Sequence, residues 1–281
     1  MIRTRRAPLF IVPLTVVAQG LVLWTGFALG TDWMRALARA TGGWVNPNLP
    51  GAAVLFALSV VPFVFVWARL RPRDIGLEAG KVCAAAAVVG LLWLGTEAGL
   101  AAAAAVARTT GPGMAAVRTG GGEREVSEAL GFLMAMLVAM PVLEEATYRG
   151  FVLPQLWLRI RGGPRVRFWG AVAGSSLLFA LVHIPNRWFL RGLAGPEMAT
   201  SLAAVFLGGI FYAAVYLRTA NLWVAGGVHA LMNAPTPLVH PILRPQIVMV
   251  PLILVLLVVW PTLPWGGRRS VLSGAAVEVV G

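Results

Sequence analysis

Charged residues are scarce in this chain of 281 residues: Asp, Glu, Lys and Arg make up 12% of it, whereas 58% is hydrophobic. A soluble domain carries about twice that charged fraction. The composition therefore excludes a soluble globular protein, a disordered chain and a fibrous repeat. Together with a mean hydropathy of +0.79, it predicts an all-α integral membrane protein.

Cysteine and lysine are almost absent. Cys83 is the sole cysteine, so no disulfide can form within the chain, and its place in an apolar run predicts an inert, buried thiol. Lys81 is the sole lysine, and the other basic residues are arginines. The net charge of +12 would suggest a nucleic-acid partner in a soluble protein. In a membrane protein it is better explained by cytoplasmic loops facing anionic lipid, so we expect membrane lipid and no nucleic acid as partners.

Long apolar runs dominate what is present. A transmembrane helix needs about 20 mostly apolar residues. The first run follows three arginines, as in a signal peptide, but it is too long for a cleaved signal, so we expect an uncleaved anchor. Eight segments meet the length requirement: 8–31, 49–68, 82–107, 129–158, 168–186, 198–217, 219–239 and 245–267.

The arginine distribution predicts the orientation. With eight spans, 14 basic residues fall in the segments predicted to be cytoplasmic and 8 in the opposite loops at 32–48, 108–128, 187–197 and 240–244. By the positive-inside rule, both termini lie in the cytoplasm, and we expect the inner membrane of a bacterium. We divide the chain into N-terminal helices at 1–128, a core at 129–240, and a last helix with a tail at 241–281.

Charged residues within the membrane are costly and need a reason. On a helix, Glu145 and Arg149 are four residues apart and share a face, so we expect an intrahelical ion pair. Glu144 points about 100° away on that helix and lacks this partner, which suits a general base. Pro141 and Pro154 are expected to kink the segment.

Two further pairs lie in later spans. Phe179 and His183 share one helix face, and His229 and Asn233 share another. Taken alone, His183 is typical of an interfacial or already hydrogen-bonded histidine, and His229 with Asn233 is typical of polar residues that stabilise helix contacts. Three such sets in a charge-poor chain instead predict one polar chamber inside the membrane. Straight helices would place His183 nearer the outer side than Glu144 and His229.

The three motifs, in this order, resemble the CAAX prenyl endopeptidase and bacteriocin-processing (CPBP, or Abi) family of intramembrane proteases. That family's pattern is EExxxR, then FxxxH, then HxxxN or HxxxD. The matching positions are Glu144 and Glu145 with Arg149, Phe179 with His183, and His229 with Asn233. The ordered set is specific, although each motif alone is weak, and the resemblance covers residues 130–240.

The resemblance implies hydrolysis of a peptide bond in a membrane-associated protein or peptide. Glu144 would take a proton from water, His183 would position that water, and His229 with Asn233 would stabilise the oxyanion. Glu145 and Arg149 would hold the helix. Proteins of the family are commonly described as metalloproteases, so Glu144, His183 and His229 could instead hold one divalent metal such as zinc. Because HExxH is absent, a metal-free glutamate mechanism stays open.

Two other classes of function compete with this interpretation. A proton-coupled transporter would use the same intramembrane Glu and His residues as relays, but the chain has no internal repeat of the kind typical of transporters. A non-catalytic membrane scaffold could retain the fold, but it would not need an unpaired Glu144. The sequence does not indicate the oligomeric state.

Overall fold

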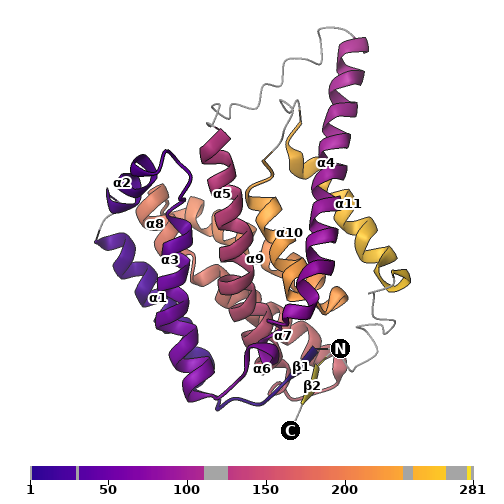
Figure 1. Ribbon diagram of the computed structural model, residues 1–281. Helices are drawn as coiled ribbons and strands as arrows, with labels where there is room; N and C mark the ends of the chain where they lie inside the picture. The colour runs from indigo at the N-terminus through magenta and orange to yellow at the C-terminus, as the bar shows by residue number, and fades with distance from the viewer. Residues whose placement is uncertain (1, 30–31, 111–125, 237–242, 264–276, 280–281) are drawn as a thin grey trace.

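The structure of the protein is a computed structural model that describes residues 2–29, 32–110, 126–236, 243–263 and 277–279. Helices form most of these residues (Figure 1). The first half of the chain contains β1 (Ile2–Thr4), α1 (Ile11–Ala28), α2 (Asp32–Ala40), α3 (Asn48–Leu55), the π-helix η1 (Phe56–Trp67), the short 3₁₀ helices η2 (Pro72–Ile75) and η3 (Ala79–Lys81), and α4 (Val82–Thr110). The second half contains α5 (Val126–Ala139), the π-helix η4 (Met140–Val152), α6 (Leu153–Trp157), α7 (Pro164–Leu181), α8 (Ile184–Arg191), α9 (Gly195–Thr219), α10 (Leu222–Asn233), α11 (Pro245–Val259), the 3₁₀ helix η5 (Trp260–Thr262) and β2 (Val277–Val279).

The prediction of an all-α polytopic membrane protein is confirmed. Within the described residues, seven helical stretches are long and apolar enough to cross a membrane, and each overlaps one of the predicted spans. The predicted loops at 108–128 and 240–244 and the tail at 268–281 lie mostly outside the described residues. The seven stretches are Ile11–Ala28, Asn48–Trp67, Ala79–Ala107, Ser127–Trp157, Pro164–Arg191, Gly195–Thr219 and Pro245–Thr262.

The predicted span 219–239 is wrong in length. Thr219 ends α9, and the helix among the described residues after it is α10, whose 12 residues extend for about 18 Å, short of a hydrocarbon core of about 30 Å. Pro235 and Pro237 explain this early end, because proline cannot donate the helical hydrogen bond and disfavours helix in the residue before it. The short helix is nevertheless central: it packs against α4, α5, α9 and η4, and nearly all of its side chains are buried.

Both termini lie on the same side of the bundle (Figure 1). β1 pairs in parallel with β2, with Ile2 opposite Val277, a small sheet that the sequence analysis did not predict. Gln155 of α6 is hydrogen-bonded to the segment that follows β1. Its Nε2 donates to the Arg5 carbonyl at 2.7 Å, and its Oε1 accepts from the Ala7 amide at 3.0 Å.

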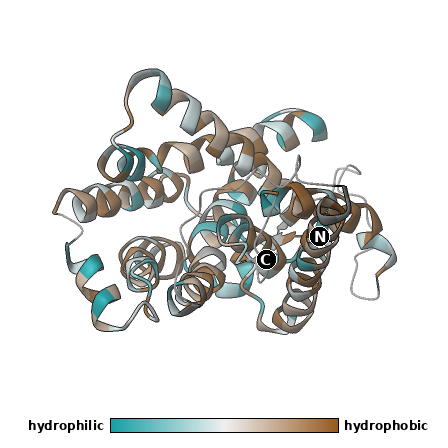
Figure 2. Ribbon diagram, turned by 90° about the horizontal axis from the view of Figure 1, so that it is seen from above, coloured by the Kyte–Doolittle hydropathy of each residue, from teal (hydrophilic) through white to brown (hydrophobic). Residues whose placement is uncertain are grey.

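The outer surface is apolar. Large side chains such as Leu21, Leu91 and Leu207 are exposed on different helices, and hydrophobic residues cover most of the helical ribbon (Figure 2). Such a surface is expected where lipid, rather than water, surrounds the protein. Cys83 is exposed near the start of α4, so the prediction of a buried thiol is wrong: Cys83 and Val82 face outward, while Ala85 and Val88 of the same run are buried.

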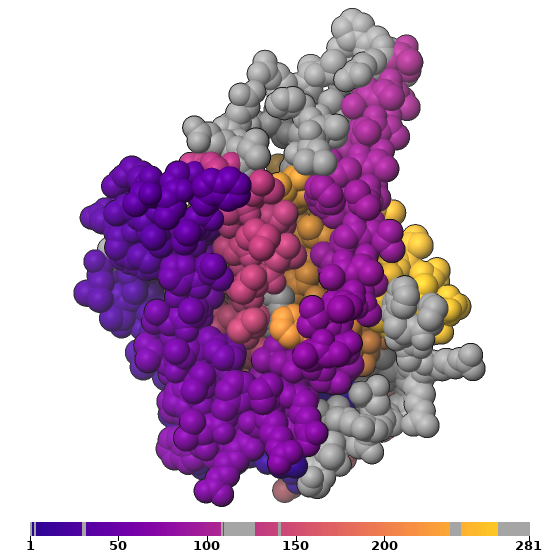
Figure 3. Space-filling model, in the orientation of Figure 1, coloured from indigo at the N-terminus to yellow at the C-terminus, as the bar shows by residue number. Residues whose placement is uncertain are grey.

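Glycines allow the helices that carry the motifs to approach their neighbours closely. A methyl group at Gly150 in η4 would collide with the carbonyl oxygen of Ile75. At Gly227 in α10 it would collide with Val89 of α4, as expected from the glycines before His229. Figure 3 shows α4 and the α1–α3 segment on either side of α5 and α10.

Asn221 sets the start of α10. Ala220 before it has a left-handed conformation, with φ of 48°, which ends α9. The Asn221 side chain then accepts hydrogen bonds from the amides of Trp223 at 3.0 Å and Val224 at 3.4 Å. This is a helix N-cap, and it sets the point from which α10 runs toward His229.

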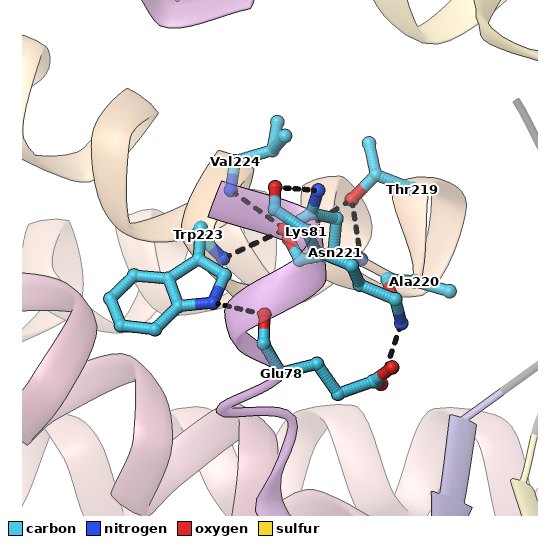
Figure 4. Close-up of polar contacts among 7 residues, drawn as sticks. All are labelled: Glu78, Lys81, Thr219, Ala220, Asn221, Trp223 and Val224. Atoms are coloured by element: carbon cyan, nitrogen blue, oxygen red, sulfur yellow. Dashed lines mark hydrogen bonds and ion pairs between the residues drawn. The ribbon is translucent and has the colours of Figure 1, made fainter. Parts of the chain in front are cut away.

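Lys81 links this turn to the start of α4 (Figure 4). Its Nζ donates to Glu78 Oε1 at 2.7 Å and to the Ala220 carbonyl at 2.8 Å. In return, Asn221 Nδ2 donates to the Lys81 carbonyl at 3.2 Å, and the Trp223 indole donates to the Glu78 carbonyl at 3.0 Å. The sole lysine of the chain therefore has a structural role at the base of α10.

Candidate active site

The two neighbouring glutamates lie on η4, a π-helix of 13 residues. Pro141 is near its start and Pro154 follows its end. In a π-helix the backbone bonds run from i to i+5, and such segments are rare and frequent at functional sites. The structure shows a π-helix between these prolines, and the kinks expected at them stay a prediction.

Glu145 and Arg149 form the predicted ion pair. Arg149 Nη1 lies 3.1 Å from Glu145 Oε1, and the two side chains are 1% and 0% exposed. Arg149 Nη2 also donates to the Gly209 carbonyl at 3.2 Å, and its guanidinium lies over the Phe179 ring at 4.3 Å. These contacts compensate for the burial of both charges.

Glu145 has a second partner that the sequence did not reveal. Its Oε1 lies 2.8 Å from His229 Nδ1. A carboxylate at this position requires a proton on Nδ1, so it orients the imidazole and directs Nε2 the other way. Tyr212 stacks on the His229 ring at 4.0 Å between centroids. The His229 ring is therefore held by a carboxylate at one edge and an aromatic face.

Glu144 lies at the opposite edge of His229. Its Oε2 is 3.7 Å from His229 Nε2, and that buried oxygen has no hydrogen-bond partner within the described structure. The Glu144 side chain is 20% exposed, unlike that of Glu145. A carboxylate oxygen without a partner, beside an imidazole nitrogen, can accept a proton from a water molecule.

His183 occupies the turn between α7 and α8. Its Nδ1 lies 2.7 Å from the Phe179 carbonyl, which requires a proton on Nδ1 and leaves Nε2 as an acceptor. The Phe179 ring contacts both histidines, at 4.6 Å from His183 and 5.9 Å from His229. Because α7 ends at Leu181, His183 lies in the turn after that helix rather than on a straight continuation of it, and its depth in the membrane stays a prediction.

A single cavity of about 930 Å³ brings the motifs together. Four of the six predicted residues line it, namely Glu144, His183, His229 and Asn233. Asn233 is the last residue of α10, one turn after His229. Glu145 and Arg149 lie behind the wall and are fully buried. Segments from α1, α2, α3, α5, α8 and α9 complete the lining.

The predicted metal ligands are Glu144, His183 and His229. In the residues that the structure describes, no three His, Cys, Asp or Glu side chains are placed to hold a metal ion. His229 directs Nδ1 to Glu145, and His183 directs Nδ1 to a carbonyl. Both Nε2 atoms remain available, and a histidine that binds a metal through one ring nitrogen commonly donates from the other to a carboxylate or a carbonyl, so the metal stays a prediction.

Gln19 is a site residue that the sequence analysis missed. This buried amide of α1 donates from Nε2 to Thr147 Oγ1 at 3.0 Å, and its Oε1 accepts from the Tyr148 hydroxyl at 2.9 Å. It also lines the cavity. The available signal was an amide side chain within the first apolar run. Tyr212, also missed, gave no signal because an isolated tyrosine in an apolar helix is common.

The comparison with protein families matches residues 126–235 to the family described as Type II CAAX prenyl endopeptidase Rce1-like. The matched stretch covers less than half of the chain and contains all six candidate residues. No curated protein and no solved structure matches the chain.

Proposed function

We propose, from the membership of residues 126–235 in the Type II CAAX prenyl endopeptidase Rce1-like family, that this protein is an intramembrane endopeptidase. It hydrolyses a peptide bond of a membrane-associated protein or peptide inside the cavity. One observation carries the proposal: the unpartnered oxygen of Glu144, 3.7 Å from an imidazole that Glu145 holds in place. We also propose a bacterial inner membrane with both termini in the cytoplasm, because of the arginine distribution.

Glu144 and His183 activate the water molecule. The His183 Nε2 lone pair accepts a hydrogen bond from the water, and Glu144 accepts its other proton as the oxygen attacks the carbonyl carbon. The resulting carboxylic acid then donates that proton to the departing amine nitrogen as the C–N bond breaks. Glu144 therefore ends the cycle ionised, as it began.

His229 and Asn233 stabilise the oxyanion by donating hydrogen bonds. When both ring nitrogens of His229 carry protons, Nδ1 donates to Glu145 and Nε2 is available to the oxyanion. The ionised groups Glu144, Glu145, Arg149 and His229 then carry no net charge, which reduces the cost of burying them. The Asn233 amide supplies a second donor from the same helix face.

Replacing Glu144 tests the proposal. The Glu144→Gln variant keeps the size and the polarity of the side chain but cannot accept the proton, so the rate of peptide cleavage should fall by about 10²- to 10⁴-fold. Cleavage is measured by mass spectrometry on purified protein, with size-exclusion profiles to check folding. Full activity in this variant would remove Glu144 from the mechanism, and a wild-type protein that cleaves nothing would favour a transporter or a scaffold.

The metal-dependent alternative has its own measurement. Metal content is determined for wild-type protein and for His183→Ala. Preparations that cleave peptides without stoichiometric metal would support the metal-free mechanism of Glu144 and His183. About one zinc per chain, lost in the variant, would instead establish a metallopeptidase with His183 as a ligand.

A further inference from the structure

Two arginines of α8 line the cavity without an acidic partner. Arg187 and Arg191 belong to the same lining as Glu144 and His183. Arg187 Nη1 donates to Asn186 Oδ1 at 3.0 Å, while its buried Nε has no hydrogen-bond partner. In the part of the chain that the structure describes, neither arginine forms an ion pair with a carboxylate.

The charge of the cavity is therefore unbalanced. Within the described lining, Glu144 is the single carboxylate, and the proposed reaction uses it for proton transfer. Neither guanidinium has a remaining counterion within the described lining; Arg187 is half-buried and Arg191 is exposed. A guanidinium presents a planar fork of N–H donors that matches a carboxylate, and a buried donor without a partner is costly. The wall of α8 is thus suited to an anionic group brought by a ligand.

The position of these arginines relates them to the reacting groups. The Arg187 amide donates to the His183 carbonyl at 3.0 Å, so Arg187 lies one helical turn beyond His183 on the same face. Arg191 lies one further turn along. At 1.5 Å per residue, the two lie about 6 Å and 12 Å from His183 along α8. An extended peptide advances about 3.3 Å per residue.

We propose that Arg187 and Arg191 form a carboxylate-binding subsite, which holds a carboxylate of the peptide substrate about two to four residues from the bond that is cleaved. This inference rests on the proposed endopeptidase function. The carboxylate has two sources in a peptide, the free C-terminus or an Asp or Glu side chain, and both present the same chemistry to the arginines.

The test uses pools of short peptides with an N-terminal fatty acyl chain. Full-length protein in phosphatidylcholine nanodiscs is given four matched peptide pools. The C-terminus is free or amidated, and the side chains include either Asp and Glu or Asn and Gln. The amidated pool with Asn and Gln is the neutral pool. Cleavage sites are read by mass spectrometry. Wild-type protein should cleave the pools that carry a carboxylate about 10- to 100-fold faster than the neutral pool. If amidation of the C-terminus slows cleavage, the bound carboxylate is the C-terminus. If replacement of Asp and Glu by Asn and Gln slows cleavage, it is a side chain.

Variants assign that preference to the arginines. Arg187→Gln and Arg191→Gln should each remove most of the preference, and Arg187→Lys should retain part of it because the charge remains without the fork. Arg165→Gln is the matched control, since Arg165 is exposed on α7 and does not line the cavity. An unchanged preference in both glutamine variants, or equal cleavage of neutral peptides by wild type, would overturn the subsite.

Binding separates failure of the subsite from failure of the proposed function. Affinity of the same peptides for Glu144→Gln is measured by thermophoresis, where no cleavage is needed. A carboxylate preference in binding that is lost with Arg187→Gln supports the subsite even if the wild type cleaves nothing. Arginine-dependent binding of phosphatidylglycerol vesicles, with no peptide carboxylate preference, would make this a lipid headgroup site and overturn the proposal.

Discussion

The two sides of η4 hold their carboxylates in different surroundings. Glu145 is 0% exposed and contacts Arg149 and His229, whereas Glu144 is 20% exposed and faces the cavity with an unpartnered oxygen. Adjacent residues of one type thus have different environments. The closed side holds Glu145 between Arg149 and His229 and positions the His229 ring, while Glu145 Oε2 makes no hydrogen bond within the described structure. On the open side, Glu144 Oε2 has no hydrogen-bond partner within the described structure and can accept a proton.

The largest effect on stability is expected on the closed side. Arg149→Met leaves the Glu145 carboxylate buried without its cation, so the free energy of unfolding in mixed micelles should fall by about 3–5 kcal/mol. The double variant Glu145→Gln with Arg149→Met removes both charges and should recover much of that loss. Arg165→Met on the exposed start of α7 is the control. A double variant as unstable as the single one would show that the ion pair is not the cause.

The open side should lose activity rather than stability. Asn233→Ala removes one proposed oxyanion donor, so kcat should fall by about 10²- to 10³-fold with little change in KM. Steady-state kinetics on a cleaved peptide measure both constants. Asn48→Ala, at another asparagine of the cavity wall, should keep the wild-type rate. A KM effect alone would place Asn233 in substrate binding.

Removal of the hydrogen bonds between Gln19 of α1 and η4 should have a smaller effect on stability and activity. Gln19→Leu removes the amide that holds Thr147 and Tyr148, and interhelical hydrogen bonds in membranes contribute about 0.6–1.7 kcal/mol. We expect a loss of this size in unfolding free energy and a moderate decrease in kcat. Gln19→Glu, which keeps an acceptor for the Tyr148 hydroxyl, should be less impaired in kcat. Wild-type stability in Gln19→Leu would show that this contact contributes nothing.

The smallest effect is expected far from the cavity, at the base of α10. Asn221→Ala removes the N-cap and should cost about 1 kcal/mol of unfolding free energy. Because this cap sets the register of His229, kcat should also decrease slightly. Asn221→Ser, which can cap the helix, should restore both. Loss of activity equal to that of Asn233→Ala would mean that α10 shifts as a whole.

Much of the helical architecture could be predicted from local sequence. Apolar runs of the length of a bilayer must form helices in lipid, since every backbone group has to be bonded within the segment. The failures were also local in origin: the span at 219–239 was overestimated because Pro235 and Pro237 interrupt it. The parallel pairing of β1 with β2 joins residues from opposite ends of the chain, and no local pattern predicts such a contact.

The sequence by itself determined the polytopic helical class, the order of the three motifs and the ion pair of Glu145 with Arg149, because these depend on composition and on spacing within one helix. Only the tertiary structure decided which groups meet across helices. The contact of Glu145 with His229, the stacking of Tyr212 on His229 and the hydrogen bonds of Gln19 join segments far apart in the chain. Helix packing sets these contacts, and helical periodicity does not encode which faces of distant helices will meet.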